Sequence, residues 1–243
     1  MRTDVKTGLQ TVGDSLLMQE GRWDFAQAVD AFDRHVEKSI PFCREGRDYV
    51  AKLATFFVRP DSLVYEIGVS TGALAVAVLR RVAGHEFQYV GIDVVPGMVE
   101  RANSTLSRDP RFSGVIADAV GYNFDQASLF LSYYTLHFIR PQRRAVLMGK
   151  IYQALELGGA LIMYEKIRAP DARFQDMLTQ LYMEFKQGSG FKSEEIINKS
   201  KALKGVSEPF TTEENLTLLR HAGFRNTMVI HKAYCFEGYL AVK

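Results

Sequence analysis

The sequence is poor in cysteine and has no long hydrophobic run. Its 243 residues include two cysteines, Cys43 and Cys235, and no pair at C-x-x-C spacing. A disulfide scaffold or a structural zinc site is therefore not expected, and a reducing cytoplasm suits the chain. No apolar stretch reaches the roughly 20 residues that a transmembrane helix needs. Residues 1–19 lack the apolar core of a signal peptide, so secretion is not expected.

A strong charge of either sign is also missing. Lysine and arginine total 30 against 28 acidic residues, which gives a net charge of +2 and a sequence pI near 8.4. This balance does not favour nucleic acid as a partner. Two short basic clusters, at 140–144 and 199–204, lack an aromatic platform for stacking bases, and we expect them to be solvated helix faces. The length and a hydrophobic content of 47% suffice for one substantial core.

The most informative stretch is VYEIGVSTGA at residues 64–73. A strand-like apolar run leads into Glu66, and Gly68 and Gly72 precede a helical pattern that opens at Ala73. Glycine at a strand-to-helix turn lets the backbone take positive φ and approach a ligand closely. For this loop by itself, a merely tight turn is the alternative interpretation.

An acid about twenty residues further on indicates a nucleoside site. Residues 87–93 have the pattern of a buried strand that ends in Asp93, whose carboxylate can accept both ribose hydroxyls. The loop lacks the third glycine of the dinucleotide fingerprint. Glu66 precedes it, and an acid there suits a cationic group such as the ammonium of an amino acid rather than a pyrophosphate. The combination favours S-adenosylmethionine over NAD.

Strand-like and helix-like patterns alternate over residues 59–165. We expect strands near 63–66, 89–93, 114–116, 128–132 and 160–164, and helices over 74–82, 98–106 and 143–157. This alternation predicts a parallel sheet with helices on both faces and a ligand site at the carboxyl ends of the strands. Glu66, Asp93, Asp118 and the segment 132–137 all fall at those ends.

The N-terminal residues are predicted to form a tail and a lid over the site. Residues 1–22 read as a flexible tail, and 23–58 as two amphipathic lid helices separated at Pro41. The second of these helices is expected over 48–57. Exposed apolar faces here or in the later insertion would suit a homodimer.

The C-terminal third predicts an insertion and a return to the sheet. Residues 166–210 break the alternation and form a helical insertion that would serve as a second part of the lid. Residues 211–243 contain a helix capped at Thr211 and ended at Gly223, followed by two closing strands. We expect the whole chain to form a single domain around the core of residues 59–165.

Several stretches of the sequence carry a family likeness. The motif order resembles that of class I S-adenosylmethionine-dependent methyltransferases and, more narrowly, the bacterial carboxy-S-adenosylmethionine synthases of tRNA wobble-uridine modification. The likeness runs from about Trp23 to the C-terminus and implies a Rossmann-like α/β sheet closed by an antiparallel hairpin. The matching stretches are FDRHV (32–36), EIGVSTGA (66–73), ID (92–93), TLHF (135–138), KIYQAL (150–155), GGAL (158–161), EK (165–166), FK (185–186) and AGF (222–224).

The resemblance implies S-adenosylmethionine as the cofactor and S-adenosylhomocysteine as the product. It places the ribose on Asp93 and the adenine beside Asp118 and Ala119. The expected cofactor-binding residues are Glu66, Gly68, Ser70, Gly72, Asp93, Val94, Met98, Asp118, Ala119 and Tyr133. No metal site is expected.

The residues that define carboxyl transfer in those synthases are not preserved. The resemblance implies a tyrosine, an arginine and an asparagine at positions that here hold Cys43, Ser200 and Tyr133. Neither cysteine nor serine replaces a guanidinium that pairs with a carboxylate. Lys199 or Lys201 turned inward would be a substitute of poorer geometry.

We therefore expect an enzyme that transfers a methyl group to a small molecule, in a setting such as secondary metabolism. The catalytic candidates are Tyr133, Tyr134 and His137, of which His137 has the pKa range of a general base. A histidine that merely packs against its loop is the alternative. Two other functions stay open: a carboxy-S-adenosylmethionine synthase that uses prephenate, and a cofactor-binding protein without chemistry of its own.

Overall fold

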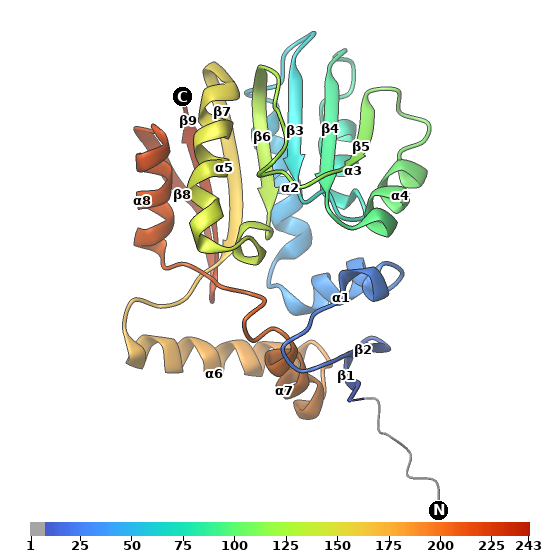
Figure 1. The fold of residues 1–243 in the computed structure, drawn as a ribbon, viewed down its shortest axis with the longest axis vertical. Helices are drawn as coiled ribbons and strands as arrows, with labels where there is room; N and C mark the ends of the chain where they lie inside the picture. The colour runs from blue at the N-terminus through green and yellow to red at the C-terminus, as the bar shows by residue number, and fades with distance from the viewer. Residues whose placement is uncertain (1–7) are drawn as a thin grey trace, which may run out of the picture.

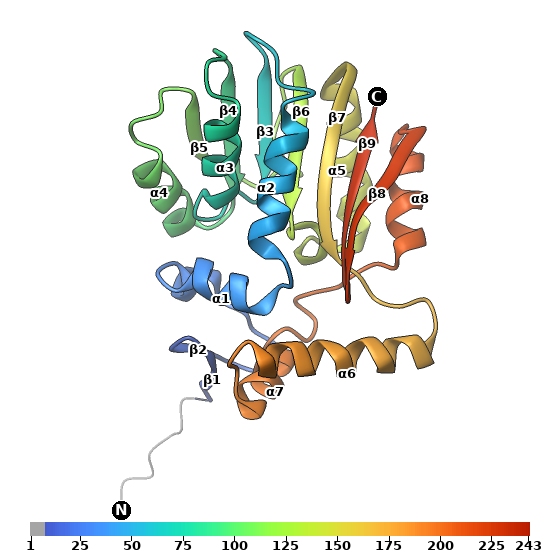
Figure 2. The same ribbon diagram turned by 180° about the vertical axis from the view of Figure 1, so that it is seen from behind.

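A central sheet organises the structure, a computed structural model that describes residues 8–243 (Figure 1; Figure 2 shows it from behind). Its seven strands are β3 (Leu63–Ile67), β4 (Gln88–Asp93), β5 (Phe112–Ile116), β6 (Ala127–Tyr133), β7 (Leu155–Lys166), β8 (Asn226–Ala233) and β9 (Phe236–Val242). They lie in the order β5-β4-β3-β6-β7-β9-β8. Strands β3 to β7 are parallel, whereas β9 is antiparallel to both β7 and β8. The predicted α/β sheet with a closing antiparallel hairpin is confirmed.

Helices cover both faces of this sheet. The helices are α2 (Cys43–Ala54), α3 (Ala73–Arg81), α4 (Pro96–Thr105), α5 (Pro141–Ala154) and α8 (Thr212–Ala222). Helices α2 and α3 pack on one face, where Val50 and Val78 join a buried cluster with Val64 of β3. Helices α5 and α8 pack on the other, where Leu147 and Leu219 join a second cluster. Because both faces are covered, the central strands are predominantly apolar, as expected for a parallel sheet.

The core elements agree with the sequence prediction except at some boundaries. Strand β7 begins at Leu155 rather than near 160, because α5 ends at Ala154. Helix α8 has the predicted capping box, in which the Thr211 side chain accepts from the Glu214 amide, and Gly223 ends it with φ of 120°.

The prediction of a flexible tail over residues 1–22 is wrong for its second half. Residues 1–7 lie outside the described part of the chain. Strands β1 (Gln10–Gly13) and β2 (Leu16–Met18) form a hairpin against helix α7 (Ser193–Ala202). Val12 and Met18 are buried there, and the Asn198 amide donates to the Thr11 carbonyl at 3.0 Å. This pairing depends on a helix almost 190 residues later, so the local pattern did not reveal it.

The N-terminal and inserted helices lie opposite the carboxyl ends of the strands (Figure 1). The single helix expected from Trp23 is broken into a short 3-10 turn, η1 (Phe25–Ala28), and α1 (Phe32–Ser39), and α2 begins at Cys43 rather than near 48. The insertion consists of α6 (Ala172–Gly188) and α7. Among residues 8–243, no helix has the length and apolar character needed to cross a membrane.

The basic cluster at 140–144 is not a uniformly solvated face. Arg144 is 2% exposed, and its guanidinium donates to the carbonyls of Ile139 at 2.8 Å and Glu208 at 2.6 Å. It also lies over the ring of Phe210. Arg144 therefore ties the start of α5 to the segment that follows the insertion.

The loop after β3 depends on a glycine in the neighbouring strand. Gly91 of β4 lies under Val69, and a Cβ at position 91 would come within 2.5 Å of Val69 Cγ2. We predict that Gly91→Ala lowers the free energy of unfolding by about 1–3 kcal/mol, because the loop must shift away from the strand. Urea denaturation followed by circular dichroism measures this difference.

Gly149 supplies the matched control. It lies within α5, and a methyl group added there would meet no atom of a neighbouring segment within 4 Å. Gly149→Ala should therefore leave stability unchanged or raise it by about 0.5–1 kcal/mol. Equal effects of the two substitutions would contradict the proposed contact between Gly91 and Val69.

Candidate functional site

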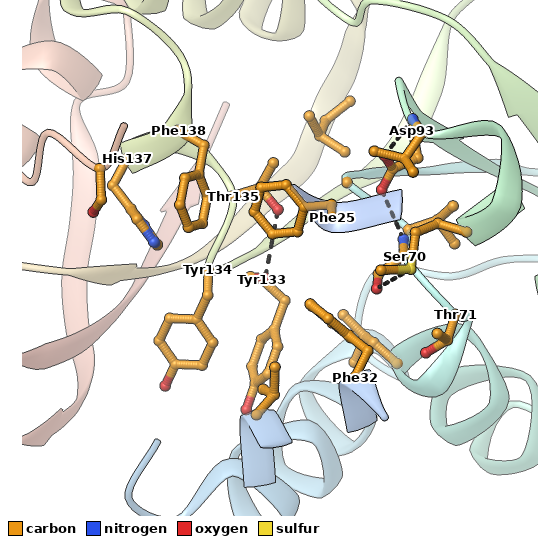
Figure 3. A pocket seen from close by; sticks show the side chains of 18 of the residues that line it. Phe25, Phe32, Ser70, Thr71, Asp93, Tyr133, Tyr134, Thr135, His137 and Phe138 are labelled. Atoms are coloured by element: carbon orange, nitrogen blue, oxygen red, sulfur yellow. Dashed lines mark hydrogen bonds between the residues drawn. The ribbon is translucent and has the colours of Figure 1, made fainter. Parts of the chain in front are cut away.

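A cavity of about 500 Å³ opens at the carboxyl ends of β3, β4 and β6. Its walls come from four parts of the chain that are distant in sequence: the N-terminal helices, the strand ends, the segment after β6, and the insertion. Figure 3 shows Asp93 and Ser70 on one side of the cavity and Tyr134 and His137 on the other, with aromatic rings between them. The volume is typical of a site for a small ligand or cofactor.

The glycine loop after β3 forms the cofactor side of this cavity. Gly68 has φ of 76°, and a Cβ there would meet the Thr135 hydroxyl oxygen at 2.2 Å. The amides of Gly68 and Val69 donate to the Ile92 carbonyl at 2.7 and 3.0 Å, which folds the loop over the end of β4. Glycine is therefore required at position 68 by its positive φ and by the close approach of the Thr135 side chain.

Gly72 is the one predicted cofactor-binding residue that lies outside the cavity. It precedes α3 with φ of 84°, and a Cβ there would lie 3.2 Å from Ala102 of α4. The other predicted cofactor-binding residues do line the cavity: Glu66, Gly68, Ser70, Asp93, Val94, Met98, Asp118, Ala119 and Tyr133.

The Asp93 carboxylate is fixed by two backbone amides. Oδ2 accepts from Ser70 N at 2.9 Å and Oδ1 accepts from Val95 N at 3.0 Å (Figure 3). Burial raises the pKa of this carboxyl, and the amide hydrogen bonds offset part of that rise. Each oxygen keeps a further lone pair, so the side chain can still accept the hydroxyls of a ribose.

Glu66 is buried beside Asp93 and has an unusual pKa. Its Oε2 accepts from the Tyr89 hydroxyl at 2.6 Å, and the residue is 2% exposed. Burial raises the pKa of Glu66 to about 8, and the charge of Asp93 adds to the rise. A cation in the cavity would favour the ionised form.

Asp118 marks the open end of the cofactor side. It is exposed, pairs with Arg143 at 2.6 Å, and accepts from Val120 N at 3.0 Å. Burial by itself would raise the pKa of Asp118, but the hydrogen bond and charge of Arg143 bring it below the usual value. The position beside Ala119 fits the predicted adenine end.

The two tyrosines after β6 line the opposite side. The Tyr133 hydroxyl donates to the Cys43 carbonyl at 2.8 Å. Tyr134 has φ of 61°, and its buried hydroxyl has no hydrogen-bond partner among the described residues. Burial raises the pKa of both phenols, so they stay protonated at neutral pH. Neither can therefore serve as a general base, and the hydrogen of the Tyr133 hydroxyl is already donated to Cys43.

His137 is held by Glu165 at the end of β7. Glu165 is buried and accepts the amides of Leu136 and His137, each at 2.8 Å. It also lies 2.8 Å from His137 Nδ1, and because a carboxylate accepts hydrogen bonds, this contact assigns the imidazole proton to Nδ1. In the neutral imidazole, Nε2 is then the nitrogen without a proton, on a ring that lines the cavity.

Cys43 and Ser200 stand where the resemblance implies a carboxylate-binding tyrosine and arginine, and neither offers a charge to a carboxylate. Burial raises the pKa of the Cys43 thiol to about 11, so it stays neutral, and Ser200 is exposed and does not line the cavity. Lys199 does line it, whereas Lys201 does not. Lys166 also lines the cavity, but the sequence did not predict it as a site residue. Its only indication there was its place in the EK pair at the end of β7.

Comparisons with known proteins agree with this arrangement. Residues 64–159 match the family model described as a methyltransferase domain. The chain is 34% identical over 224 residues to the carboxy-S-adenosyl-L-methionine synthase of Staphylococcus epidermidis, covering 91% of this chain and 97% of that protein. It is 30% identical over 221 residues to the synthase of the same name from Shewanella oneidensis, covering 90% and 91%.

Solved structures share the fold at lower identity. Human N-acetylserotonin methyltransferase in complex with S-adenosylmethionine aligns with a TM-score of 0.63 at 20% identity, over 90% of this chain and 55% of that one. The pyocyanin biosynthetic protein PhzM aligns with a TM-score of 0.66 at 16% identity, over 91% and 62%. The chain thus spans little more than half the length of these two structures, and the likeness concerns the fold.

The raised pKa of Glu66 predicts a pH-dependent affinity for S-adenosylhomocysteine, the nucleoside expected from the sequence. The buried carboxyl must release its proton before it can pair with the ligand's ammonium group. Affinity should therefore rise up to about tenfold per pH unit between pH 6 and 8, and then level off. Titration calorimetry measures the profile, and Glu66→Gln should flatten it. Parallel profiles for both proteins would contradict the pairing.

The same shift has the opposite effect on the free protein. Because the folded chain holds the Glu66 proton more tightly than the unfolded chain, this group lowers the free energy of unfolding as pH rises from about 4.5 towards 8. Urea denaturation without ligand should thus show a smaller loss of stability over this window in Glu66→Gln than in the wild type.

Proposed function

We propose that this chain, which belongs to the carboxy-S-adenosyl-L-methionine synthase family of S-adenosylmethionine-dependent methyltransferases, transfers a methyl group from S-adenosylmethionine to a small-molecule acceptor. The protein is an enzyme, and S-adenosylmethionine is its cofactor. The finer assignment, methyl transfer rather than formation of carboxy-S-adenosylmethionine, rests on the residues of the cavity.

One observation carries the choice of methyl transfer. The position at which the resemblance implies a carboxylate-binding arginine holds Ser200, which is exposed and outside the cavity. The position of the implied tyrosine holds Cys43, a buried neutral thiol. Arg47, Arg140 and Arg143 do line the cavity, but Arg47 pairs with Glu37 and Arg143 with Asp118. A carboxylate carried on the sulfonium would therefore lack the bidentate guanidinium that the resemblance implies at position 200.

The residues of the cavity fit the plain cofactor. Asp93 is placed for the ribose hydroxyls, Glu66 for the ammonium group, and the pocket beside Asp118 and Ala119 for the base. When bound, S-adenosylmethionine supplies an activated methyl group, and its sulfur leaves as a neutral thioether.

His137 and Glu165 would supply the remaining chemistry. Nε2 of His137 accepts the proton that the acceptor loses as it takes the methyl group, and the Glu165 carboxylate stabilises the resulting imidazolium. The aromatic walls exclude water and align the acceptor with the methyl group.

A second function is favoured by one specific observation. Lys199 lines the cavity, as it would in a synthase with a rebuilt carboxylate pocket. Such an enzyme would use prephenate to convert S-adenosylmethionine into carboxy-S-adenosylmethionine.

Mass spectrometry of the nucleoside that co-purifies with the protein separates the two functions. Carboxy-S-adenosylmethionine in the purified protein, or its formation with prephenate, would overturn methyl transfer.

We predict that His137→Gln lowers the rate of methyl transfer about a hundredfold or more, because the general base is lost. The affinity for S-adenosylhomocysteine should stay unchanged, since Asp93 and Glu66 are intact. The assay follows a deuterated methyl group from the cofactor into products of an acceptor screen. His221→Gln, an exposed histidine on α8, is the matched control and should keep the wild-type rate. Full activity in His137→Gln would exclude this residue as the base.

We also propose that the protein forms a homodimer through α6. This helix exposes a set of large apolar side chains, which are Phe174, Met177, Leu181 and Met183. A second copy would remove them from water. Light scattering coupled to gel filtration should give a dimer mass for the wild type and a monomer mass for Met177→Glu combined with Leu181→Glu. A monomeric wild type would contradict the proposal.

A further inference from the structure

The carboxylates and the lysines of the cavity lie at different ends, whereas two of its arginines are paired, Arg47 with Glu37 and Arg143 with Asp118. Its carboxylates belong to Asp33, Glu66, Asp93 and Asp118. Three of them lie at or just beyond the carboxyl ends of β3, β4 and β5, and Asp33 accepts a hydrogen bond from the Thr71 hydroxyl at 2.7 Å, which places it at the same loop. The acidic end therefore coincides with the cofactor side. The lysines of the cavity, Lys166 and Lys199, come from the end of β7 and from α7.

Lys199 is held in place by neutral groups. Its Nζ lies 2.6 Å from Ser39 Oγ and 2.7 Å from His35 Nε2. His35 Nδ1 in turn lies 3.1 Å from an Asp14 carboxylate oxygen. Burial and the charge of Lys199 lower the pKa of His35 to about 3, so the imidazole is neutral and accepts from the ammonium. Two of the three N–H groups of Lys199 are thereby used, and the third has no acceptor within residues 8–243.

Two further lysines flank Tyr182 of α6. Lys166 and Lys186 lie with their Nζ atoms 5.4 and 4.3 Å from the centre of the Tyr182 ring. Lys186 is buried, and burial together with the charge of Lys166 lowers its pKa to about 8. Burial, Lys186 and Lys166 lower the pKa of Lys199 as well. Within the described residues, none of the three forms an ion pair with a carboxylate.

Like charges gathered in a partly desolvated place destabilise a protein unless a counter-ion joins them. Two other lysines are compensated: Lys38 pairs with Asp14, and Lys150 donates to the carbonyls of Val120 and Tyr122. Lys166 and Lys199, which line the cavity, and Lys186 behind them form no ion pair with a carboxylate among residues 8–243. This contrast points to an anion that the bound substrate supplies.

We propose that the lysine end of the cavity binds the carboxylate of the methyl acceptor, with Lys166 and Lys199 as its direct partners. Lys186 raises the positive potential behind them. Much of the remaining wall of the cavity is apolar and aromatic, and it includes Phe32 and Phe138. The acceptor is thus a small carboxylic acid with an apolar or aromatic body. This inference rests on the proposed methyl transfer and names the substrate class of the same site.

The arrangement also explains how neutral molecules are rejected. A neutral analogue of the acceptor would fill the aromatic part of the cavity but leave the lysines without a counter-ion. Sites built for a polar group discriminate strongly against analogues that lack it, because the buried partners stay unpaired. The sulfonium and the carboxylate are held at opposite ends, so each charge meets the complementary wall.

Titration calorimetry with a matched pair of probes tests the proposal. Protein saturated with S-adenosylhomocysteine is titrated with 3-phenylpropanoate and, separately, with 3-phenylpropanamide, which has nearly the same shape without the charge. The wild type should bind the acid about tenfold or more tightly than the amide. Lys199→Met and Lys166→Met should each lose this preference. Lys204→Met removes an exposed lysine just beyond α7 and should retain it.

The affinity for S-adenosylhomocysteine, measured in every variant, shows that the cofactor side is folded. Equal binding of acid and amide by the wild type, absence of heat with the acid at millimolar concentration, or a preference retained in both cavity variants would overturn the carboxylate site while leaving methyl transfer standing. If S-adenosylhomocysteine itself did not bind the wild type, the proposed function and this inference would fall together.

Discussion

The hydrogen bonds between the Asp93 carboxylate and the amides of Ser70 and Val95 are the constraint on which the site depends. They join the loop after β3 to the loop after β4 and fix both against one side chain. Gly68 permits the same loop to pass under Thr135, so the segment that carries Tyr133, Tyr134 and His137 is positioned from the same point. Cofactor side and acceptor side are therefore parts of one arrangement.

Several ionisable groups in and around the cavity are buried, which lowers the stability of the empty protein. Glu66 is buried with a pKa near 8, while three lysines, two of them with lowered pKa values, gather around the cavity without a carboxylate partner among residues 8–243. A ligand of opposite charge would offset the cost of burying each of these groups. A cofactor with a sulfonium and an ammonium group suits the acidic end, and an acceptor with a carboxylate suits the other. Part of the stability of the fold is thus given up to create affinity, as is common at functional sites.

Local patterns were sufficient to predict the sheet, the glycine loop and the strand-end acids. Alternation of strand and helix is read within short windows, and parallel strands bring their carboxyl ends to one edge. Features that depend on distant contacts were not predictable. The hairpin at residues 10–18 needs α7, Arg144 is buried only because the segment around Glu208 folds over it, and Glu165 is buried only because the His137 loop covers it. Gly72 has the expected conformation, but it faces α4 rather than the cavity.

A crystal structure of the protein with S-adenosylhomocysteine would test the central claim most directly. The account predicts ribose hydroxyls on the Asp93 carboxylate, the ammonium group at Glu66, and the sulfur open towards Tyr134 and His137. A nucleoside bound elsewhere, or one bound in this cavity without contact to Asp93, would contradict it.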